Sequence, residues 1–206
     1  MFWDYFITYK MNRLKQTILI KRIRNQDTEA FREVYQIFAD KIYRYIFFRI
    51  PSQEQAEDLL QDVFLKFWNY LAGEDVKVDN LQALLYRLAK TSIAGYYLTQ
   101  GQQKNIAERD KVDLDEMEWQ LESKDDIEHE IDIKMRVKQV HQQLDTLGNE
   151  EYKEVIELRY LQGLSHKEIA EVMNKSENNI RVLFHRALKK LKENLTEDED
   201  DSNKSN

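Results

Sequence analysis

The chain has 206 residues, of which 42% are hydrophobic and 33% charged, and its formal net charge is -7. The absence of cysteine excludes a disulfide framework, a thiolate zinc site and a cysteine nucleophile. No apolar run approaches the roughly 18 residues of a membrane-spanning helix, so we expect no membrane insertion. One proline and five glycines favour helix over sheet, and we predict an all-α protein of two small helical domains joined by a linker.

The negative charge is confined to two segments. Residues 1–104 hold 15 Lys/Arg against 12 Asp/Glu, and residues 134–195 hold 12 against 9. Residues 105–133 hold 3 against 12, and residues 196–206 hold 1 against 5. We therefore predict an acidic linker at 105–133 and a disordered acidic tail at 196–206, with a mildly basic block before each of them.

Residues 1–24 are interpreted as an N-terminal extension. The opening MFWDYFITYK lacks the long apolar core and the small-residue cleavage site of a signal peptide, and Met11 begins a more ordinary N-terminus. The first domain is predicted at 25–104. Its first apolar stripe has helical spacing and stops just before Pro51, and it consists of Phe31, Tyr35, Phe38, Ile42 and Ile46.

Two further helices are predicted in the first domain. Ser52 and Gln55 form a capping box for a helix that reaches Leu71 with a continuous apolar stripe. The polar segment 72–80 is predicted to be a loop. Asp79 or Asn80 can cap a following helix that runs toward Gly101 and buries Leu81, Leu84, Leu85 and Leu88.

The second domain, residues 134–195, is predicted to hold four helices. The first carries Val137, Val140, Leu144 and Leu147 and stops at Gly148, a common position after a helix C-terminus. Asn149 caps the second helix, which ends at Gly163. Ser165 and Glu168 form a capping box for a short third helix, and Ser176 caps the fourth.

The third and fourth helices have the layout of a helix-turn-helix. The third helix is about two turns long and buries Ile169, Ala170 and Met173, and Asn174 tolerates the left-handed turn that follows. Ile180 is placed to pack the fourth helix back on the third, so that the opening residues of the fourth face outward, as a major-groove reader requires. The predicted DNA-binding residues are Ser176, Asn178, Asn179, Arg181, His185, Arg186 and Lys189. An antiparallel helix pair with a solvated lysine-rich end is the structural alternative.

The chain resembles the extracytoplasmic-function (ECF) sigma factors of bacterial RNA polymerase over roughly residues 25–104 and 134–193. The resemblance rests on AEDLLQDVFLKFW at 56–68, LQALLYRLAK at 81–90 and LRYLQGLSHKEIAEVMNKSENNIRVLFHRALKKL at 158–191. Each segment alone is a weak indicator, but the three together, separated by an acidic linker, are specific. The resemblance implies a non-enzymatic initiation subunit in the cytoplasm, without a cofactor. It would bind core RNA polymerase and promoter DNA and be held by an anti-sigma factor.

The resemblance also implies where each partner binds. The C-terminal helix-turn-helix would contact the -35 promoter element, and the N-terminal domain would bind polymerase and melt the -10 element. The exposed face of the helix at 56–68 gives the candidate polymerase contacts Asp58, Gln61, Asp62 and Lys66. Aromatic residues can stack on unpaired bases and cations can bind phosphates, which gives the -10 candidates Tyr86, Arg87, Lys90, Tyr96 and Tyr97.

The sequence departs from the family pattern at two places. The family usually has Asn, then Asp, then a basic pair after the segment at 81–90, and this chain has Thr91, Gly95, Leu98 and Thr99 there. In the recognition helix, Val182 and Leu183 stand where the family often has a small polar residue and an arginine. These departures predict either a shifted promoter preference or weak -10 melting.

Two other functions are consistent with parts of the sequence. A stand-alone helix-turn-helix regulator would bind duplex DNA by itself, but it needs a dimerisation or ligand domain in the first block. A hydrolase could use Asp58 and Asp62 on one helix face, but no third ligand or nucleophile is evident. The sigma-factor interpretation requires that Asn178, Asn179 and Arg181 are exposed, and that the two domains do not share one continuous hydrophobic interior. The acidic linker and tail are expected to disfavour DNA binding until polymerase separates the domains.

Overall fold

The computed structural model describes residues 11–50, 52–73, 78–99 and 143–204. Within these ranges the chain is helical and has no strand, which confirms the all-α prediction. The predicted linker at 105–133 lies outside the described residues. No helix in the described ranges is long and apolar enough to cross a lipid bilayer. The helices are α2 (Arg13–Arg24), α3 (Thr28–Phe47), α4 (Gln53–Ala72), α5 (Leu81–Thr99), α7 (Glu150–Ile156), α8 (His166–Met173) and α9 (Glu177–Lys204), with a π-helical segment η2 (Glu157–Leu161) after α7.

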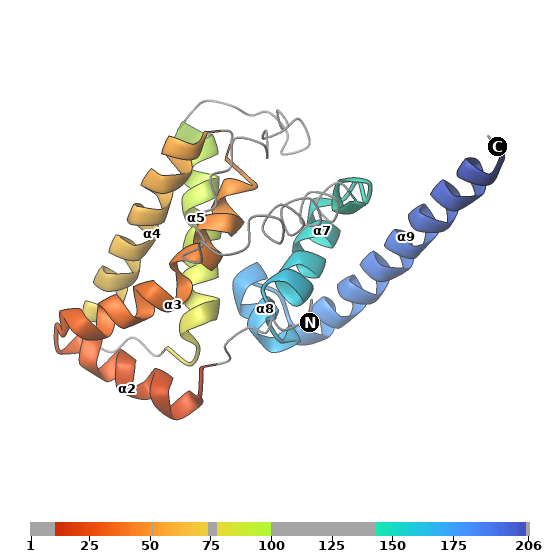
Figure 1. Cartoon of the computed structure of the whole chain (residues 1–206). Coiled ribbons are helices and arrows are strands. Elements are labelled where there is room, and N and C mark those ends of the chain that lie inside the picture. Colours follow the sequence, from red (N-terminus) through yellow and green to blue (C-terminus); the bar gives the residue numbers. More distant parts are fainter. Residues whose placement is uncertain (1–10, 51, 74–77, 100–142, 205–206) are drawn as a thin grey trace, which may run out of the picture.

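The helices α2 to α5 form what we call the N-terminal lobe, residues 11–99 (Figure 1). Asp27 accepts hydrogen bonds from the amides of Glu29 and Ala30 and so caps α3. The predicted apolar stripe of α3 packs on α4 and α5, although Tyr35 at its edge is exposed. The fully buried side chains of the lobe include Phe38, Ile42, Ile46, Phe67, Leu71, Leu81 and Leu85.

Helix α2 corrects the interpretation of residues 1–24 as an extension. Leu19, Ile20 and Ile23 are buried against α3 and α4, and Met11 joins the same core. Residues 19, 20 and 23 lie on one face of a helix, so the burial follows from their spacing. Residues 11–24 therefore belong to the N-terminal lobe.

The predicted caps of α4 and α5 are present, with one difference. Ser52 accepts the amide of Gln55, but the Gln55 side chain accepts the Tyr96 hydroxyl at 2.5 Å. The predicted capping box is therefore only half formed, because Gln55 ties α4 to α5 instead. Asn80 caps α5 by accepting the amide of Ala83 at 2.9 Å.

The C-terminal lobe, residues 143–204, contains α7, η2, α8 and α9. Asn149 caps α7 as predicted, but the helix changes to a π-helix at Glu157 before Gly163 is reached. Ser165 and Glu168 form both halves of the predicted capping box. Ser176 accepts the amide of Asn179 at the start of α9.

Helix α9 extends further than expected. It continues to Lys204, so the backbone of residues 196–204 is helical and the prediction of a disordered tail is wrong. Neither glycine nor proline occurs after Gly163, so no residue of the usual helix-breaking types ends the helix.

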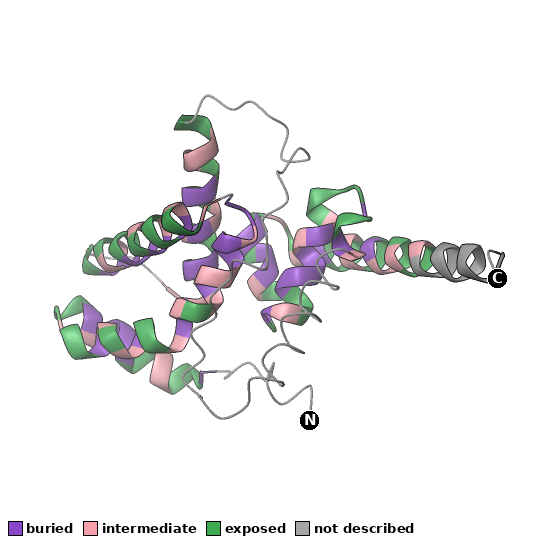
Figure 2. Ribbon diagram, turned by 45° about the horizontal axis from the view of Figure 1, so that its top comes forward, coloured by how far each residue is buried: buried purple, intermediate pink, exposed green. Residues whose placement is uncertain are grey.

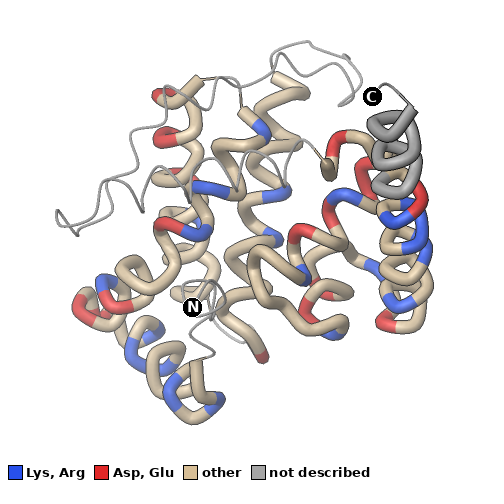
Figure 3. The backbone as a smooth tube through the Cα atoms, turned by 45° about the vertical axis from the view of Figure 1, so that its right-hand side comes forward, with Lys and Arg blue, Asp and Glu red and all other residues tan. Residues whose placement is uncertain are grey.

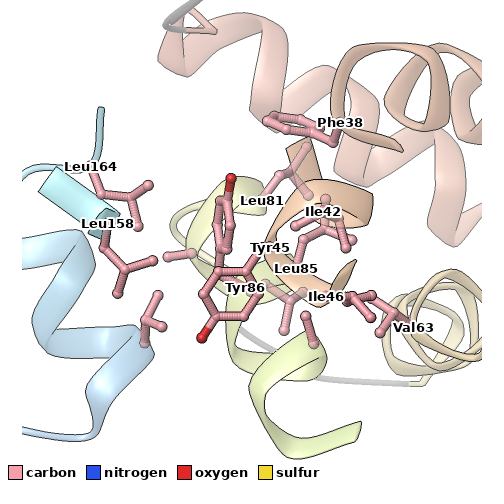
Figure 4. Packing of buried hydrophobic residues seen from close by; sticks show 14 of the residues in the cluster. Phe38, Ile42, Tyr45, Ile46, Val63, Leu81, Leu85, Tyr86, Leu158 and Leu164 are labelled. Carbon is pink, nitrogen blue, oxygen red and sulfur yellow. The ribbon is translucent and has the colours of Figure 1, made fainter. Parts of the chain in front are cut away.

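The two lobes pack against each other, mainly through α5 and α8 (Figures 1 and 4). The prediction of separate interiors is wrong, because buried apolar residues of both lobes form one contiguous cluster. Figure 4 shows Leu158 and Leu164 of the C-terminal lobe facing Tyr45 and Tyr86 of the N-terminal lobe. Polar contacts surround this junction, as described below, so the junction differs from the interior of either lobe.

Substituting alanine at two glycines should change the free energy of unfolding in opposite directions. Gly95 lies inside α5, and a Cβ atom built there meets no atom within 4 Å, whereas Gly148 has a φ of +62°. Gly95→Ala should raise the free energy of unfolding by about 1 kcal/mol through helix propensity. Gly148→Ala should lower it by about 1–2 kcal/mol, because alanine is strained in the left-handed region. Urea denaturation followed by circular dichroism measures both, and effects of equal sign would contradict this description of α5 and of the turn.

Candidate nucleic-acid and polymerase interfaces

The turn between α8 and α9 has the predicted helix-turn-helix geometry. Asn174 adopts the left-handed conformation, with φ 52° and ψ 47°, and its amide donates to the Ala170 carbonyl. Ile169 and Ile180 are fully buried across the turn, which fixes α9 against α8. The Lys175 ammonium lies 2.8 Å from the Glu151 carboxylate and so ties the turn to the start of α7.

All seven residues predicted to bind DNA lie on the exposed surface at and after this turn (Figure 2). Asn178, Arg181, His185 and Lys189 fall on one face of α9, because they are separated by three or four residues. Asn179 and Arg186 flank that face, and Ser176 precedes it. Basic residues recur along α9 (Figure 3). The first requirement of the sequence interpretation, exposure of Asn178, Asn179 and Arg181, is therefore met. The second requirement, separate hydrophobic interiors, is not met.

Sequence reasoning missed Glu177 on this surface. The Arg181 guanidinium donates to the Glu177 carboxylate at 2.7 Å, one helical turn away. This hydrogen bond holds the pKa of Glu177 below its ordinary value, so the pair is charged near neutral pH. Arg181 would therefore have to exchange or share this partner in order to contact another group. The spacing of four residues between an acid and a base was the available signal.

A cluster of aromatic rings packs on the side of α9 that is turned away from the seven predicted DNA-binding residues. The Phe184 ring lies 5.2 Å from His166 and 5.8 Å from Tyr160, measured between ring centroids. Burial, followed by the nearby Arg159 and Arg181, lowers the pKa of His166. His166 is thus held neutral at the amino end of α8, where it packs as an aromatic ring.

The candidate polymerase contacts lie along one face of α4. Asp58, Gln61 and Lys66 are exposed, and Asp62 is half-buried. Lys66 donates to Asp62 at 2.6 Å and to the Ser92 hydroxyl at 2.9 Å, and Ser92 in turn donates to Asp62. This network orients the centre of the face against α5. It also pairs one of the two carboxylates that a hydrolase would need, and no cluster of three possible metal ligands occurs in the part of the chain described.

Leu65 is a further residue of this face that sequence reasoning missed. Its side chain is 59% exposed although its neighbours Phe64 and Phe67 are buried. Residue 65 lies one turn from Gln61 and Asn69 on the same side of α4. An exposed leucine between polar side chains adds an apolar contact to a surface that otherwise offers charges and amides.

The -10 candidates on α5 have different surroundings. Arg87 is exposed, and its guanidinium carbon lies 5.8 Å from the Tyr70 ring centroid. The Tyr96 and Tyr97 rings pack edge to face at 5.2 Å, and both hydroxyls are engaged, with Gln55 and with the Arg49 carbonyl. The Tyr96 hydroxyl binds the start of α4, and the Tyr97 hydroxyl binds the segment just before it. Arg87 is therefore the most accessible of the five -10 candidates.

Tyr86 is covered by the C-terminal lobe, whereas Lys90 is paired with that lobe and keeps 41% of its side chain exposed. The Tyr86 side chain is fully buried, and its hydroxyl donates to the Gln162 side chain at 2.5 Å. Lys90 donates to Glu154 at 2.7 Å. In this arrangement Tyr86 is unable to stack on a base, which corrects that part of the prediction.

The junction between the lobes contains a buried ion pair that sequence reasoning missed. The Arg49 guanidinium makes a two-pronged contact with the Glu157 carboxylate and also donates to the Tyr45 carbonyl at 2.8 Å. Burial alone would lower the pKa of Arg49, but Glu157 outweighs it and the net pKa is raised. Burial raises the pKa of the Tyr45 hydroxyl, which donates to Glu154 at 3.1 Å. The signal was present as a single charge inside each of two short apolar runs, FFRI and VIEL.

Further hydrogen bonds join the lobes at the other end of the junction. Gln82 donates to the Gln162 carbonyl at 3.0 Å, and Asn80 donates to Glu168 at 2.6 Å. The junction is therefore an apolar contact with a buried ion pair and a set of partly buried hydrogen bonds.

A helix-turn-helix lobe beside a second helical lobe is typical of a DNA-binding protein. Two family models match the chain: Sigma-70 region 2 over residues 34–102, and Sigma-70, region 4 over residues 138–191. The two matches fall on the two lobes. The chain belongs to the ECF subfamily of RNA polymerase sigma factors, which are transcription initiation factors. This assignment rests on the sequence matches over each lobe and not on separate hydrophobic interiors.

Individual relatives agree with this assignment. The ECF RNA polymerase sigma factor BldN of Streptomyces coelicolor is 27% identical over 180 residues, which cover 87% of this chain and 66% of BldN. The ECF RNA polymerase sigma factor SigM of Bacillus subtilis is 26% identical over 160 residues, which cover 78% of this chain and 91% of SigM. A solved structure of CnrH in complex with the cytosolic domain of CnrY matches with a TM-score of 0.62 at 19% identity, over 88% of this chain and 97% of CnrH, which supports the fold.

Proposed function

We propose that this sigma factor reads the -35 promoter element with the exposed face of α9. The observation that carries the proposal is the joint exposure of Asn178, Arg181, His185 and Lys189 on one side of a helix that Asn174 and Ile180 fix in place. Arginine and asparagine can each make paired hydrogen bonds to base edges in the major groove. Ser176, Arg186 and Lys189 supply the phosphate contacts that set the register.

The α4 face is the proposed contact with core polymerase. Asp58, Gln61, Asp62 and Lys66 supply polar contacts, and Leu65 supplies an apolar centre. The network with Ser92 supports the proposal because it holds two of these side chains in one geometry before binding. Preorganised side chains lose less conformational entropy when a complex forms.

The -10 element is proposed to bind the α5 side of the N-terminal lobe. Arg87 is accessible for a phosphate contact, and Lys90 is partly exposed but paired with Glu154. Tyr86 becomes accessible only when the C-terminal lobe moves away. Tyr96 and Tyr97 hold the end of α5 in place, and each presents part of its ring. Thr91, Leu98 and Thr99 are exposed where the family pattern has polar or basic residues, so this side of α5 offers few further cations.

The chain is also proposed to act in the cytoplasm, where the polymerase works, and to bind an anti-sigma factor. The solved structure of CnrH with the cytosolic domain of CnrY supports a protein partner of this kind.

Arg181→Ala tests the recognition surface. A good pair of base contacts contributes about 1–3 kcal/mol of discrimination, so promoter-specific run-off transcription with core polymerase should fall at least about fivefold. The matched control is Arg32→Ala on α3, another exposed arginine paired with a glutamate on its own helix. Core binding should be unchanged in both variants. Equal transcription by the two variants would contradict the role of α9, and tight duplex binding by the chain alone would favour a stand-alone regulator.

Leu65→Asp tests the polymerase surface. The substitution replaces the apolar centre of the α4 face by a charge, so affinity for core polymerase should fall at least about tenfold, as expected for an interface hot spot. Leu14→Asp on α2 is the control, since Leu14 is also exposed but lies on a different helix. Fluorescence anisotropy with labelled protein measures both affinities. The proposal fails if Leu65→Asp binds core as the parent does, or if both variants lose binding equally.

A further inference from the structure

Two ion pairs join the lobes, each between a glutamate of the C-terminal lobe and a cation of the N-terminal lobe. Glu157 contacts Arg49, and Glu154 contacts Lys90. The Gln162 side chain accepts a hydrogen bond from the Tyr86 hydroxyl, so a third polar contact joins the two lobes. The N-terminal side of the junction thus combines the buried Arg49, the partly exposed Lys90 and the fully buried Tyr86.

A single-stranded nucleic acid offers the chemistry that this surface would bind. Phosphates pair with arginine and lysine, and bases stack on aromatic rings. The carboxylates of Glu154 and Glu157 are anions like phosphates, and they lie on α7 and η2 about one helical turn apart. The C-terminal lobe therefore presents an acidic surface to the cations that an unpaired strand would need.

We call the arrangement in which the two lobes are packed together the closed state. The buried ion pair contributes more to the specificity of this state than to its free energy. Removing both charges from water is costly, and the mutual attraction of Arg49 and Glu157 roughly offsets that cost. Loss of one partner is different, because it leaves an unpaired buried charge. Closure is therefore sensitive to any competitor that supplies Arg49 with another anion and returns Glu157 to water.

We infer that Arg49, Tyr86 and Lys90 form a single-strand binding site that Glu154 and Glu157 mask in the free chain. Arg49 is a phosphate-binding residue of this site, in addition to the -10 candidates on α5. The two lobes are parts of one chain, so the mask competes intramolecularly with an added strand. The recognition face of α9 stays exposed in the same arrangement, so closure blocks one DNA contact and leaves the other free. The inference rests on the proposed function for the role of the open site.

The experiment uses the full chain with two dyes and a single-stranded probe. The chain has no cysteine, so Gln36→Cys on α3 and Lys192→Cys on α9 provide specific labelling sites on the two lobes. Energy transfer between the dyes reports closure, and anisotropy of a fluorescein-labelled mixed-sequence 15-mer of single-stranded DNA reports binding. Circular dichroism checks that each variant keeps its helix content.

Glu157→Gln should open the chain, because it leaves Arg49 buried without its counter-charge. The ratio of closed to open molecules should fall at least about tenfold, and affinity for the 15-mer should rise at least about tenfold. Adding Lys90→Gln to this variant should remove most of the gain in affinity and leave the chain open. The matched control is Glu151→Gln, since Glu151 is an exposed acid on α7, just before η2, and is paired within its own lobe.

Asn80→Asp provides a second way to open the junction if Glu157→Gln loses helix content. Aspartate caps a helix as well as asparagine does, but it places a carboxylate opposite Glu168, which now accepts from Asn80. Lower energy transfer together with tighter 15-mer binding supports the inference. Unchanged energy transfer in both variants would show that these contacts do not hold the lobes together. Lower energy transfer without tighter binding of the 15-mer would show that no single-strand site is masked. Either result overturns the inference.

Core polymerase distinguishes this inference from the proposed function. Core should bind the labelled Gln36→Cys/Lys192→Cys chain with its junction otherwise unchanged, and reduce the energy transfer between the dyes. If core does not bind, the proposed function fails. If core binds and supports promoter-specific transcription while energy transfer stays high, the mask is wrong and the proposed function stands.

Discussion

The arrangement of the two lobes depends on a guanidinium and a carboxylate that are buried together. Arg49 comes from the turn after α3, and Glu157 comes from the first residue of a π-helical segment. A π-helical segment changes the direction of the side chains that follow it, and such segments often occur at functional sites. Here the change in helix type coincides with the residue that pairs across the junction. Tyr45, Tyr86, Lys90 and Glu154 surround the pair, so polar groups at the junction are matched to partners of the opposite lobe.

The elements themselves follow from local sequence signals. Caps at Ser52, Asn80, Asn149, Ser165 and Ser176 are found where a short polar side chain precedes an apolar stripe. Asn174 was predictable as the left-handed corner because few other residue types accept that conformation. The exposure of the recognition face was predictable because Ile180 and Ala187 bury the opposite side of α9. These features depend on residues within one or two turns of each other.

The features that sequence reasoning missed depend on contacts between distant residues. Arg49 and Glu157 are 108 positions apart, and each reads locally as an isolated charge in an apolar run. The burial of Tyr86 depends on a lobe that begins after the linker, so the periodicity of α5 alone does not place its hydroxyl. Residues 11–24 read as an extension because the apolar face of α2 is short, and only its packing on α3 and α4 assigns it to the lobe.

The central claim is that this chain reads upstream promoter DNA as a subunit of polymerase. A photo-crosslinking amino acid at Val182, an exposed position beside Arg181 on α9, tests it most directly on a library of duplex promoter fragments. The account predicts strong crosslinks to one short upstream element when core polymerase is present, and weak, unspecific crosslinks without it. Equally strong and specific crosslinks by the chain alone, or their absence in the complex with core, would contradict it.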